Sequence, residues 1–376
     1  MERCGVLIVG AGMAGASAAY ELAAQFNVVL VEREAHPGYH TTGRSAALFS
    51  ETYGNTAIRG LTVGSRAFYM NPPGGFTEHP LLTDRGVMLI ARADQMGRAR
   101  DWAAEASALV PSVRLITAEE AYAKVPVLRP GYVAGAVFEP TAMDIDVHSL
   151  HQGYLRGLRA RGGRLVTDAD VTGLAPDGKG WRVETSAGAW RADVVVNASG
   201  AWADVIAALA GLAPVGLVPK RRTALLIDPP DAIAIDRWPA TIDMDEQFYF
   251  KPDAGKLLMS PADETPFAPC DVQPDELDIA ICVDRVQTAA DLPVRRINRS
   301  WAGLRSFVAD KTPVVGFEPG ISGFFWLAGQ GGYGIQTAPA MGRLTASLVG
   351  GNGVPADLAA LGVTAAALAP DRFRTS

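Results

Sequence analysis

Cysteine and histidine are scarce in this chain of 376 residues, which has three of the first and five of the second. The cysteines, Cys4, Cys270 and Cys282, show neither paired nor metal-type spacing, and the histidines form no cluster. This pattern argues against a disulfide framework and against a Cys/His metal site. It is what we expect of a protein in a reducing compartment.

The chain also lacks a strong excess of charge and a long apolar run. Its net charge is −6, so nothing favours nucleic acid or an anionic membrane as the main partner. No apolar stretch approaches the length that spans a bilayer, and the first expected strand starts too early to leave room for a signal peptide. We therefore expect a cytoplasmic protein and leave peripheral membrane contact open.

Glycine is abundant, with 40 residues, and its most informative arrangement lies within residues 5–32. An apolar run at 5–9 leads into Gly-Ala-Gly-Met-Ala-Gly at 10–15, followed by an Ala-rich helical stretch. A second apolar run at 28–31 ends in Glu32. This order is the strand–turn–helix–strand pattern of a dinucleotide-binding fold.

Each part of this motif has a physical role. Gly10 permits the tight turn, Gly12 lets the backbone approach a pyrophosphate, and Gly15 lets the helix pack closely on the strand. The helix N-terminus offers free N–H groups and a positive dipole end to the phosphates. Glu32 can accept hydrogen bonds from ribose hydroxyls, which disfavours NADP, but the motif does not separate NAD from FAD.

Segments of this type recur in the middle and at the end of the chain, with two different blocks between them. We expect an α/β protein with a discontinuous Rossmann-like domain at 1–50, 141–215 and 311–376. A strand-rich α+β domain that binds the substrate is expected at 51–140 and 216–310, with a ligand cleft where the two domains meet. Expected helices lie at 101–109 and 146–161, and expected strands at 88–90, 165–166, 181–184, 191–197, 247–251, 256–260 and 323–328.

Residues 37–45, Pro-Gly-Tyr-His-Thr-Thr-Gly-Arg-Ser, form a stretch rich in small and hydroxyl side chains. Such a loop suits contact with a phosphate or a flat ring. It equally suits an exposed turn, so the residues alone leave both interpretations open.

Four segments, at 10–15, 41–46, 197–202 and 329–334, resemble in this order the D-amino-acid oxidase superfamily of FAD-dependent amine oxidoreductases. Within that superfamily, the chain resembles the bacterial FAD-dependent D-arginine dehydrogenases over essentially its whole length. The blocks that carry the narrower resemblance lie at 34–40, 151–157, 301–310 and 330–337.

The resemblance implies FAD, bound without a covalent link in the Rossmann-like domain. It places Ala14 near the pyrophosphate, Glu32 and Arg33 at the adenosine end, and the backbone of Val171 at the adenine. With the phosphate loop and the loop beside the flavin ring, the implied cofactor contacts are Gly10, Gly12, Ala14, Gly15, Glu32, Arg33, Thr41, Thr42, Gly43, Arg44, Ser45, Ala46, Ala47, Leu48, Val171, Gly200, Gly331, Gly332, Tyr333, Gly334, Ile335, Gln336 and Thr337.

At the substrate end, the resemblance assigns Arg222 and Arg305 to a carboxylate clamp. A guanidinium stays charged at any working pH and can hold a carboxylate through two parallel hydrogen bonds. Without the resemblance, a structural ion pair is the better interpretation of either arginine. The same resemblance implies that Tyr53 and Tyr249 are aromatic walls of the substrate pocket. It also implies that the Gly332 carbonyl accepts from the substrate amine, with Gln336 in the same loop.

Departures from the D-arginine dehydrogenase pattern make the expected pocket more apolar. Val87 stands where that group has a glutamate that holds the substrate guanidinium, and Leu48 replaces a histidine near the flavin. Ser50 replaces a threonine, and Ala240, next to Ile242 in the wall, replaces a methionine. Losing the acid removes the partner that would make burial of a cationic side chain tolerable.

We therefore expect oxidative deamination of D-amino acids with neutral or apolar side chains, giving imino acids that hydrolyse to 2-oxo acids and ammonia. Asp243 is the one residue that we consider able to restore an acidic contact, and Tyr53 the one candidate for helping to deprotonate the amine. The expected electron acceptor is a quinone or another non-oxygen acceptor.

The alternatives are an O₂-using glycine or sarcosine oxidase, a D-arginine dehydrogenase proper, a flavoprotein without activity and a plain NAD dehydrogenase.

Overall fold

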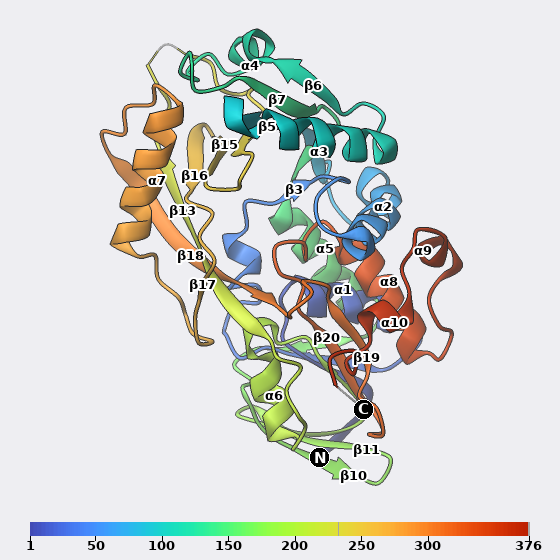
Figure 1. Ribbon diagram of the computed structural model, residues 1–376. Helices are drawn as coiled ribbons and strands as arrows, with labels where there is room; N and C mark the ends of the chain where they lie inside the picture. The colour runs from blue at the N-terminus through green and yellow to red at the C-terminus, as the bar shows by residue number, and fades with distance from the viewer. Residues whose placement is uncertain (232, 375–376) are drawn as a thin grey trace.

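The computed structural model describes residues 1–231 and 233–374 and is organised around two large sheets (Figure 1). The first sheet has eight strands, with β20 (Phe324–Ala328) paired to β12 and β19 (Val314–Phe317) paired to β20. Its main path runs through β10 (Val171–Asp177), β11 (Gly180–Thr185), β12 (Gly188–Asn197), β1 (Glu2–Val9), β2 (Val28–Val31) and β9 (Arg164–Val166).

Strand β1 lies between β2 and β12 in this sheet, and it is parallel to both. Its side chains alternate between two cores. Val6 and Ile8 belong to one buried cluster, which includes residues of the helices α1 (Met13–Leu22), α5 (Val147–Ala160) and α8 (Ala338–Val349). Leu7 and Val9 belong to the other, which includes residues of α6 (Ala203–Leu209). Coverage on both faces explains why the strand is almost wholly apolar.

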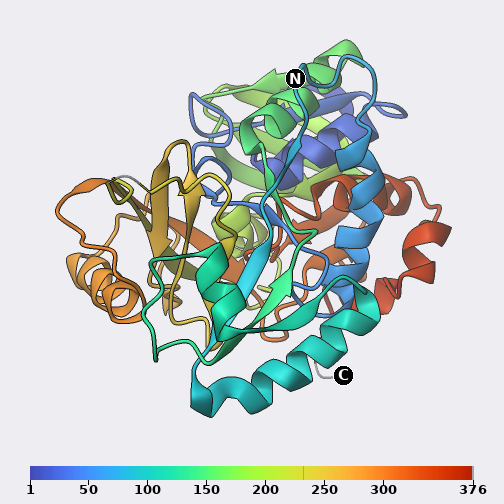
Figure 2. The same ribbon diagram turned by 90° about the horizontal axis from the view of Figure 1, so that it is seen from above.

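The second sheet has nine strands and is mostly antiparallel, with β18 (Ile297–Phe307) paired to β13. Its path runs through β17 (Thr265–Pro266), β13 (Val218–Ile227), β16 (Lys256–Ser260), β15 (Tyr249–Asp253), β14 (Ala240–Asp243), β5 (Val87–Ala91), β7 (Gly135–Glu139) and β6 (Arg114–Thr117). The helices of this part are α3 (Met96–Leu109), α4 (Ala118–Lys124) and α7 (Glu276–Ala289). Figure 2 shows the gold strands of this sheet on the left and α3 along the lower edge.

A third, small sheet joins the two parts, in the order β3 (Leu48–Phe49), β8 (Met143–Ile145) and β4 (Leu82–Asp84). The remaining helices and short 3₁₀ turns are α2 (Thr56–Met70), α9 (Ala356–Ala360), α10 (Ala365–Leu368), η1 (Thr42–Arg44), η2 (Ala93–Gln95) and η3 (Gly200–Trp202). Strand β3 matters for function because it continues directly into the turn that carries Ser50 and Tyr53.

The expected elements are found close to their predicted positions. The predicted helix at 101–109 is the C-terminal part of α3, and that at 146–161 is α5. The strand expected at 247–251 begins two residues later, as β15. The mixed α/β fold is confirmed. The strands of the first sheet come from 2–31, 164–197 and 314–328 and those of the second from 87–139 and 218–307, while the domain boundaries stay a prediction.

Candidate active site

One long cavity of about 880 Å³ runs from the glycine turn after β1 to the strands β5, β13 and β18 of the second sheet. Its volume is in the range of small-molecule and cofactor sites. Of the residues expected at the site, four do not line this cavity, namely Gly15, Gly43, Ala240 and Thr337. All the other expected site residues do line it.

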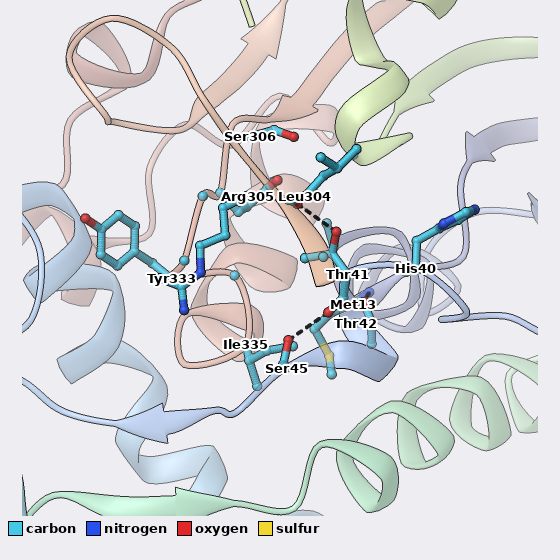
Figure 3. A pocket seen from close by; sticks show the side chains of 18 of the residues that line it. Met13, His40, Thr41, Thr42, Ser45, Leu304, Arg305, Ser306, Tyr333 and Ile335 are labelled. Carbon is cyan, nitrogen blue, oxygen red and sulfur yellow. Dashed lines mark hydrogen bonds between the residues drawn. The ribbon is translucent and has the colours of Figure 1, made fainter. Parts of the chain in front are cut away.

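The turn between β1 and α1 leaves no room for side chains. Gly10 has a φ of +96°, in the region that favours glycine, and a Cβ added at Gly15 would lie 1.8 Å from the Gly10 carbonyl oxygen. Helix α1 begins at Met13, whose amide donates to the Thr42 hydroxyl at 2.9 Å (Figure 3). This turn brings the backbone and a helix N-terminus to the cavity, an arrangement that can hold a pyrophosphate.

Glu32, at the end of β2, is buried, with 8% exposure. Its carboxylate accepts hydrogen bonds from the amides of Ala11 at 2.8 Å and Glu34 at 3.1 Å. Each oxygen has further lone pairs, so the carboxylate can still accept from ribose hydroxyls. Arg33 lies next to it, with its guanidinium 5.2 Å from the centroid of the Trp202 ring. Trp202 lines this end of the cavity, although it was not among the site residues expected from the sequence.

The loop at 41–45 is held against β18. The Thr41 hydroxyl donates to the Leu304 carbonyl at 2.7 Å, and the Ser45 hydroxyl donates to the Thr41 carbonyl at 2.8 Å (Figure 3). Arg44 donates to the carbonyl of Ala302 at 2.9 Å and forms an ion pair with Asp271. The Arg44 side chain therefore ties this loop to the second sheet, a role that the sequence did not indicate.

The loop at 331–337 lies on the opposite side of the cavity. A Cβ at Gly332 would lie 2.9 Å from an Arg305 nitrogen, so the guanidinium packs directly on this backbone. The Gln336 amide donates to the Thr62 hydroxyl at 2.8 Å, and the Thr337 hydroxyl donates to the Tyr333 carbonyl at 2.9 Å. Both polar side chains thus help to hold the loop in place.

Arg222 on β13 and Arg305 on β18 lie close together. Burial lowers the pKa of Arg222, and so does the positive charge of Arg305. Arg222 donates to the Asp263 carbonyl at 2.9 Å and lies 3.4 Å from the Glu264 carboxylate. Glu264 also pairs with Lys220 at 2.8 Å, so it neutralises Arg222 only in part.

Arg305 forms no ion pair with any carboxylate in residues 1–231 and 233–374. Burial lowers its pKa, but the phenol groups of Tyr53, Tyr249 and Tyr333 outweigh that effect and raise it overall. Figure 3 shows Arg305 between Tyr333 and the loop that carries Thr41. The cavity thus contains a permanent cation without a protein anion beside it.

Apolar side chains form another wall of the cavity. Val87 pairs with Ala240 across the parallel strands β5 and β14, and the two pack with Leu48 and Ile242. Ala240 is only 1% exposed and lies behind the wall, whereas the other three line the cavity.

Asp243 does not supply the acidic contact considered from the sequence. It is fully buried outside the cavity lining and pairs with Arg92 at 3.3 Å. It also accepts from the amide of Asp245 at 2.9 Å.

A different acid, Glu139, lies next to the cavity and was missed. It pairs with Val87 across β5 and β7, and it accepts from the hydroxyls of Ser50 and Thr52, each at 2.7 Å. Both hydroxyl residues line the cavity. The signal in the sequence was the acid at the end of the apolar run Gly-Ala-Val-Phe-Glu at 135–139, but nothing showed which strand it would face.

The model of the family described as "FAD dependent oxidoreductase" matches residues 5–348, and the chain belongs to this family. The glycine cradle, the acid at the end of β2 and the long cavity fit that cofactor, so FAD is confirmed. None of the three cysteines lines the cavity, in agreement with a non-covalent FAD.

Several curated relatives are similar over the whole chain. A glycine oxidase of Geobacillus kaustophilus is 25% identical, covering 96% of this chain and 97% of the relative. A glycine oxidase of Pseudomonas aeruginosa is 28% identical, covering 92% and 94%. Mouse mitochondrial dimethylglycine dehydrogenase is 25% identical over 95% of this chain but only 43% of the relative.

Solved structures share the fold. The crystal structure of the Geobacillus kaustophilus glycine oxidase has a TM-score of 0.83 at 23% identity, covering 97% of this chain and 99% of that one. An L-proline dehydrogenase from P. horikoshii has the same TM-score at 21% identity, covering 99% and 98%.

Residues 1–231 and 233–374 include no helix that is long and apolar enough to cross a membrane.

Proposed function

We propose that this FAD-dependent oxidoreductase oxidises D-amino acids with neutral or apolar side chains. One observation carries the proposal: Arg305 is a cation without an acidic partner in the described chain, packed on the 331–337 loop inside the cavity. Arg305 is half-buried, and holding a cation away from water without a counter-ion is costly, so a substrate carboxylate would relieve that cost.

In this proposal, Arg305 supplies the main carboxylate contact. Its fork of N–H donors can form two parallel hydrogen bonds to a carboxylate, each charge-assisted bond contributing about 1.5–3 kcal/mol. Arg222 is the second contact, weaker because it also pairs with Glu264. Tyr53 and Tyr249 complete this end as aromatic walls, and the Gly332 carbonyl is the proposed acceptor for the substrate amine. We also propose that residues 1–50, 141–215 and 311–376 form the domain that binds the cofactor. Residues 51–140 and 216–310 then form the domain that binds the substrate.

The wall of Leu48, Val87 and Ile242 supports a neutral side chain, because it offers no partner for a buried cation. When bound, FAD accepts a hydride from the substrate Cα. The residues of the chain fix the carboxylate, and thereby the direction of the Cα–H bond, and they exclude water from the reacting end. The imino acid that leaves is hydrolysed to a 2-oxo acid and ammonia, and we propose a quinone or another non-oxygen acceptor for the electrons.

The second candidate is an O₂-using glycine or sarcosine oxidase. It is supported by the glycine oxidases among the relatives, which match the full length of the chain. Such an enzyme would handle small or N-methylated amines, for which the apolar wall would be of no use.

Anaerobic reduction of the bound flavin by a panel of amines tests both candidates. The panel contains D-Leu, D-Met, D-Phe, D-Arg, D-Lys, L-Leu, glycine and sarcosine. The proposal predicts fastest reduction by a neutral D-amino acid and little hydrogen peroxide in air. Fastest reduction by glycine or sarcosine with stoichiometric peroxide would support the second candidate, and D-Arg as the best substrate would contradict both.

A further inference from the structure

Glu139, at the end of β7, is a buried carboxyl group that the proposed function does not use. Only 2% of the residue is exposed. One oxygen accepts from both the Ser50 and the Thr52 hydroxyl at 2.7 Å, while the other, Oε1, has no hydrogen-bond partner among the described residues. A group of this kind in a protein interior calls for an explanation.

A single turn connects this carboxyl group to the substrate end. The turn runs from Ser50 to Tyr53 and is closed by a hydrogen bond from the Tyr53 amide to the Ser50 carbonyl at 3.4 Å. The side chains of Ser50 and Thr52 contact Glu139, whereas Tyr53 lies beside Arg305. Ser50 and Thr52 line the cavity and donate their hydroxyl hydrogens to Glu139, so each hydroxyl oxygen keeps a lone pair that can accept a hydrogen bond.

The charged groups of the surrounding elements come from the turn, from α2 and from α3. Burial raises the pKa of Glu139; the Thr52 and Ser50 hydroxyls and the Glu51 backbone lower it, and the Glu51 carboxylate raises it. Glu51 pairs with Arg66 at 2.9 Å. Arg59, also on α2, donates to the Thr52 carbonyl at 2.9 Å and pairs with Glu105 at 2.6 Å.

Of the two strands beside β7, β5 contributes uncharged Val87 opposite Glu139, and β6 begins with Arg114 opposite Phe138. A carboxyl group in these surroundings is a better proton acceptor than one in water.

We propose that Glu139 accepts the proton that the substrate ammonium group must lose before oxidation, through the hydroxyl of Thr52 or Ser50. This rests on the proposed function. An N–H bond of the ammonium breaks, its proton bonds to the hydroxyl oxygen, and the hydroxyl's own proton moves to Glu139. Ammonium and carboxylate thus become a neutral amine and a neutral carboxylic acid, and no electrons are transferred in this step.

Glu246 is the rival acceptor. It also lines the cavity, but it is exposed to solvent and its φ of +54° places it in a turn. The experiment therefore compares Glu139→Gln with Glu246→Gln. Glu318→Gln is the matched control, because Glu318 is also buried, accepts from Trp326 at 2.8 Å and does not line the cavity.

The first measurement is the rate of anaerobic flavin reduction by the best D-amino acid as a function of pH. In Glu139→Gln we expect a rate about 100-fold lower at neutral pH. The rate should converge with the wild type at high pH, where the substrate amine is already neutral. Glu318→Gln should keep the wild-type profile. An equal loss at every pH in Glu139→Gln, or the pH-dependent loss in Glu246→Gln instead, would overturn the proposal.

The second measurement does not depend on turnover. 2-Aminoisobutyrate has an amine and a carboxylate but no Cα–H, so it can bind without being oxidised. In the holoenzyme, its binding should produce a carboxylic-acid C=O band in the infrared difference spectrum, and the band should be absent in Glu139→Gln. If the wild type gives no such band, Glu139 is not the acceptor. A double variant, Ser50→Ala with Thr52→Val, should also lose the band.

The two proposals fail in different ways. If no amino acid reduces the flavin of the wild type at any pH, the proposed function is wrong. If a D-amino acid reduces it equally fast in the wild type and in Glu139→Gln at every pH, the proposed function stands and only the role of Glu139 is wrong.

Discussion

The two ends of the cavity are built in opposite ways. At the cofactor end, the turn after β1 and the 41–47 loop present mostly backbone and small residues, with Glu32, Arg33 and Trp202 beside them. The substrate end is made of large side chains from strands that are distant in sequence, among them Arg222, Arg305 and the wall that includes Val87. Shape complementarity to one fixed ligand dominates at the first end, and charge and polarity dominate at the second.

This difference predicts different tolerances to mutation. Where backbone atoms form the site, a single added carbon displaces the chain itself. Where side chains form it, a substitution changes affinity or preference and leaves the fold intact. Four experiments test this difference between the two ends.

The largest effect is expected for Gly15→Ala at the cofactor end. The added Cβ would meet the Gly10 carbonyl oxygen at 1.8 Å, so the turn cannot keep its shape. We expect loss of bound FAD, measured as the ratio of flavin absorbance to protein. Gly97→Ala is the control, since no atom lies within 4 Å of a Cβ there. Full FAD content in Gly15→Ala would show that the turn is not rigid.

At the substrate end, Arg305→Met should lower kcat/KM for the best D-amino acid about 100-fold or more, because two charge-assisted hydrogen bonds are lost. FAD content should not change. Arg222→Met should cost less, since Arg222 already pairs with Glu264. Arg295→Met, which removes an exposed ion pair with Asp231, serves as the control. Equal kinetics of Arg305→Met and the wild type would contradict the clamp.

Val87→Glu tests whether the apolar wall sets side-chain preference. A carboxylate in this wall gives a cationic side chain a partner, so the ratio of kcat/KM for D-Lys over D-Leu should rise about tenfold, equivalent to roughly 1.4 kcal/mol. Val87→Gln has nearly the same size without the charge and should not shift the ratio in this way. If both variants shift it equally, polarity rather than charge decides.

The smallest effect concerns His151, which is buried and hydrogen-bonds to the Ala11 carbonyl at 2.8 Å through Nε2. Burial lowers its pKa from 6.5, so the folded protein resists a proton that the unfolded chain accepts. Stability should therefore fall as the pH drops below about 6.5, and stop falling below the lowered pKa of the folded state. In His151→Gln, which can still donate, the difference in Tm between pH 8 and pH 5.5 should be smaller. An unchanged difference would show that other groups cause the loss.

The cofactor end was predictable because its information is local. The turn at 10–15 and Glu32 lie in one continuous segment with a fixed spacing, and family membership confirmed both fold and cofactor. Hydrophobic periodicity likewise located β1, β12 and α5, which are long and regular.

The substrate end was only partly predictable, because register between distant strands decides it. The sequence could name Val87 and Ala240 but not their pairing across β5 and β14, and it did not indicate Glu139, which pairs with Val87 on the other side. Asp243 was considered as a residue that could restore an acidic contact in the pocket. Its side chain instead accepts from local backbone amides and pairs with Arg92, away from the cavity.

The bonds from Thr41 and Arg44 to the carbonyls of Leu304 and Ala302 have a consequence for turnover of the protein itself. They join the loop that we expect to contact FAD to β18, the strand that carries Arg305, the proposed contact for the substrate carboxylate. If these hydrogen bonds break and the loop moves away from β18, FAD and substrate lose their contacts in one event, and backbone becomes accessible to proteases. Bound FAD, which stabilises the state it binds, should therefore also stabilise this contact between the 41–45 loop and β18.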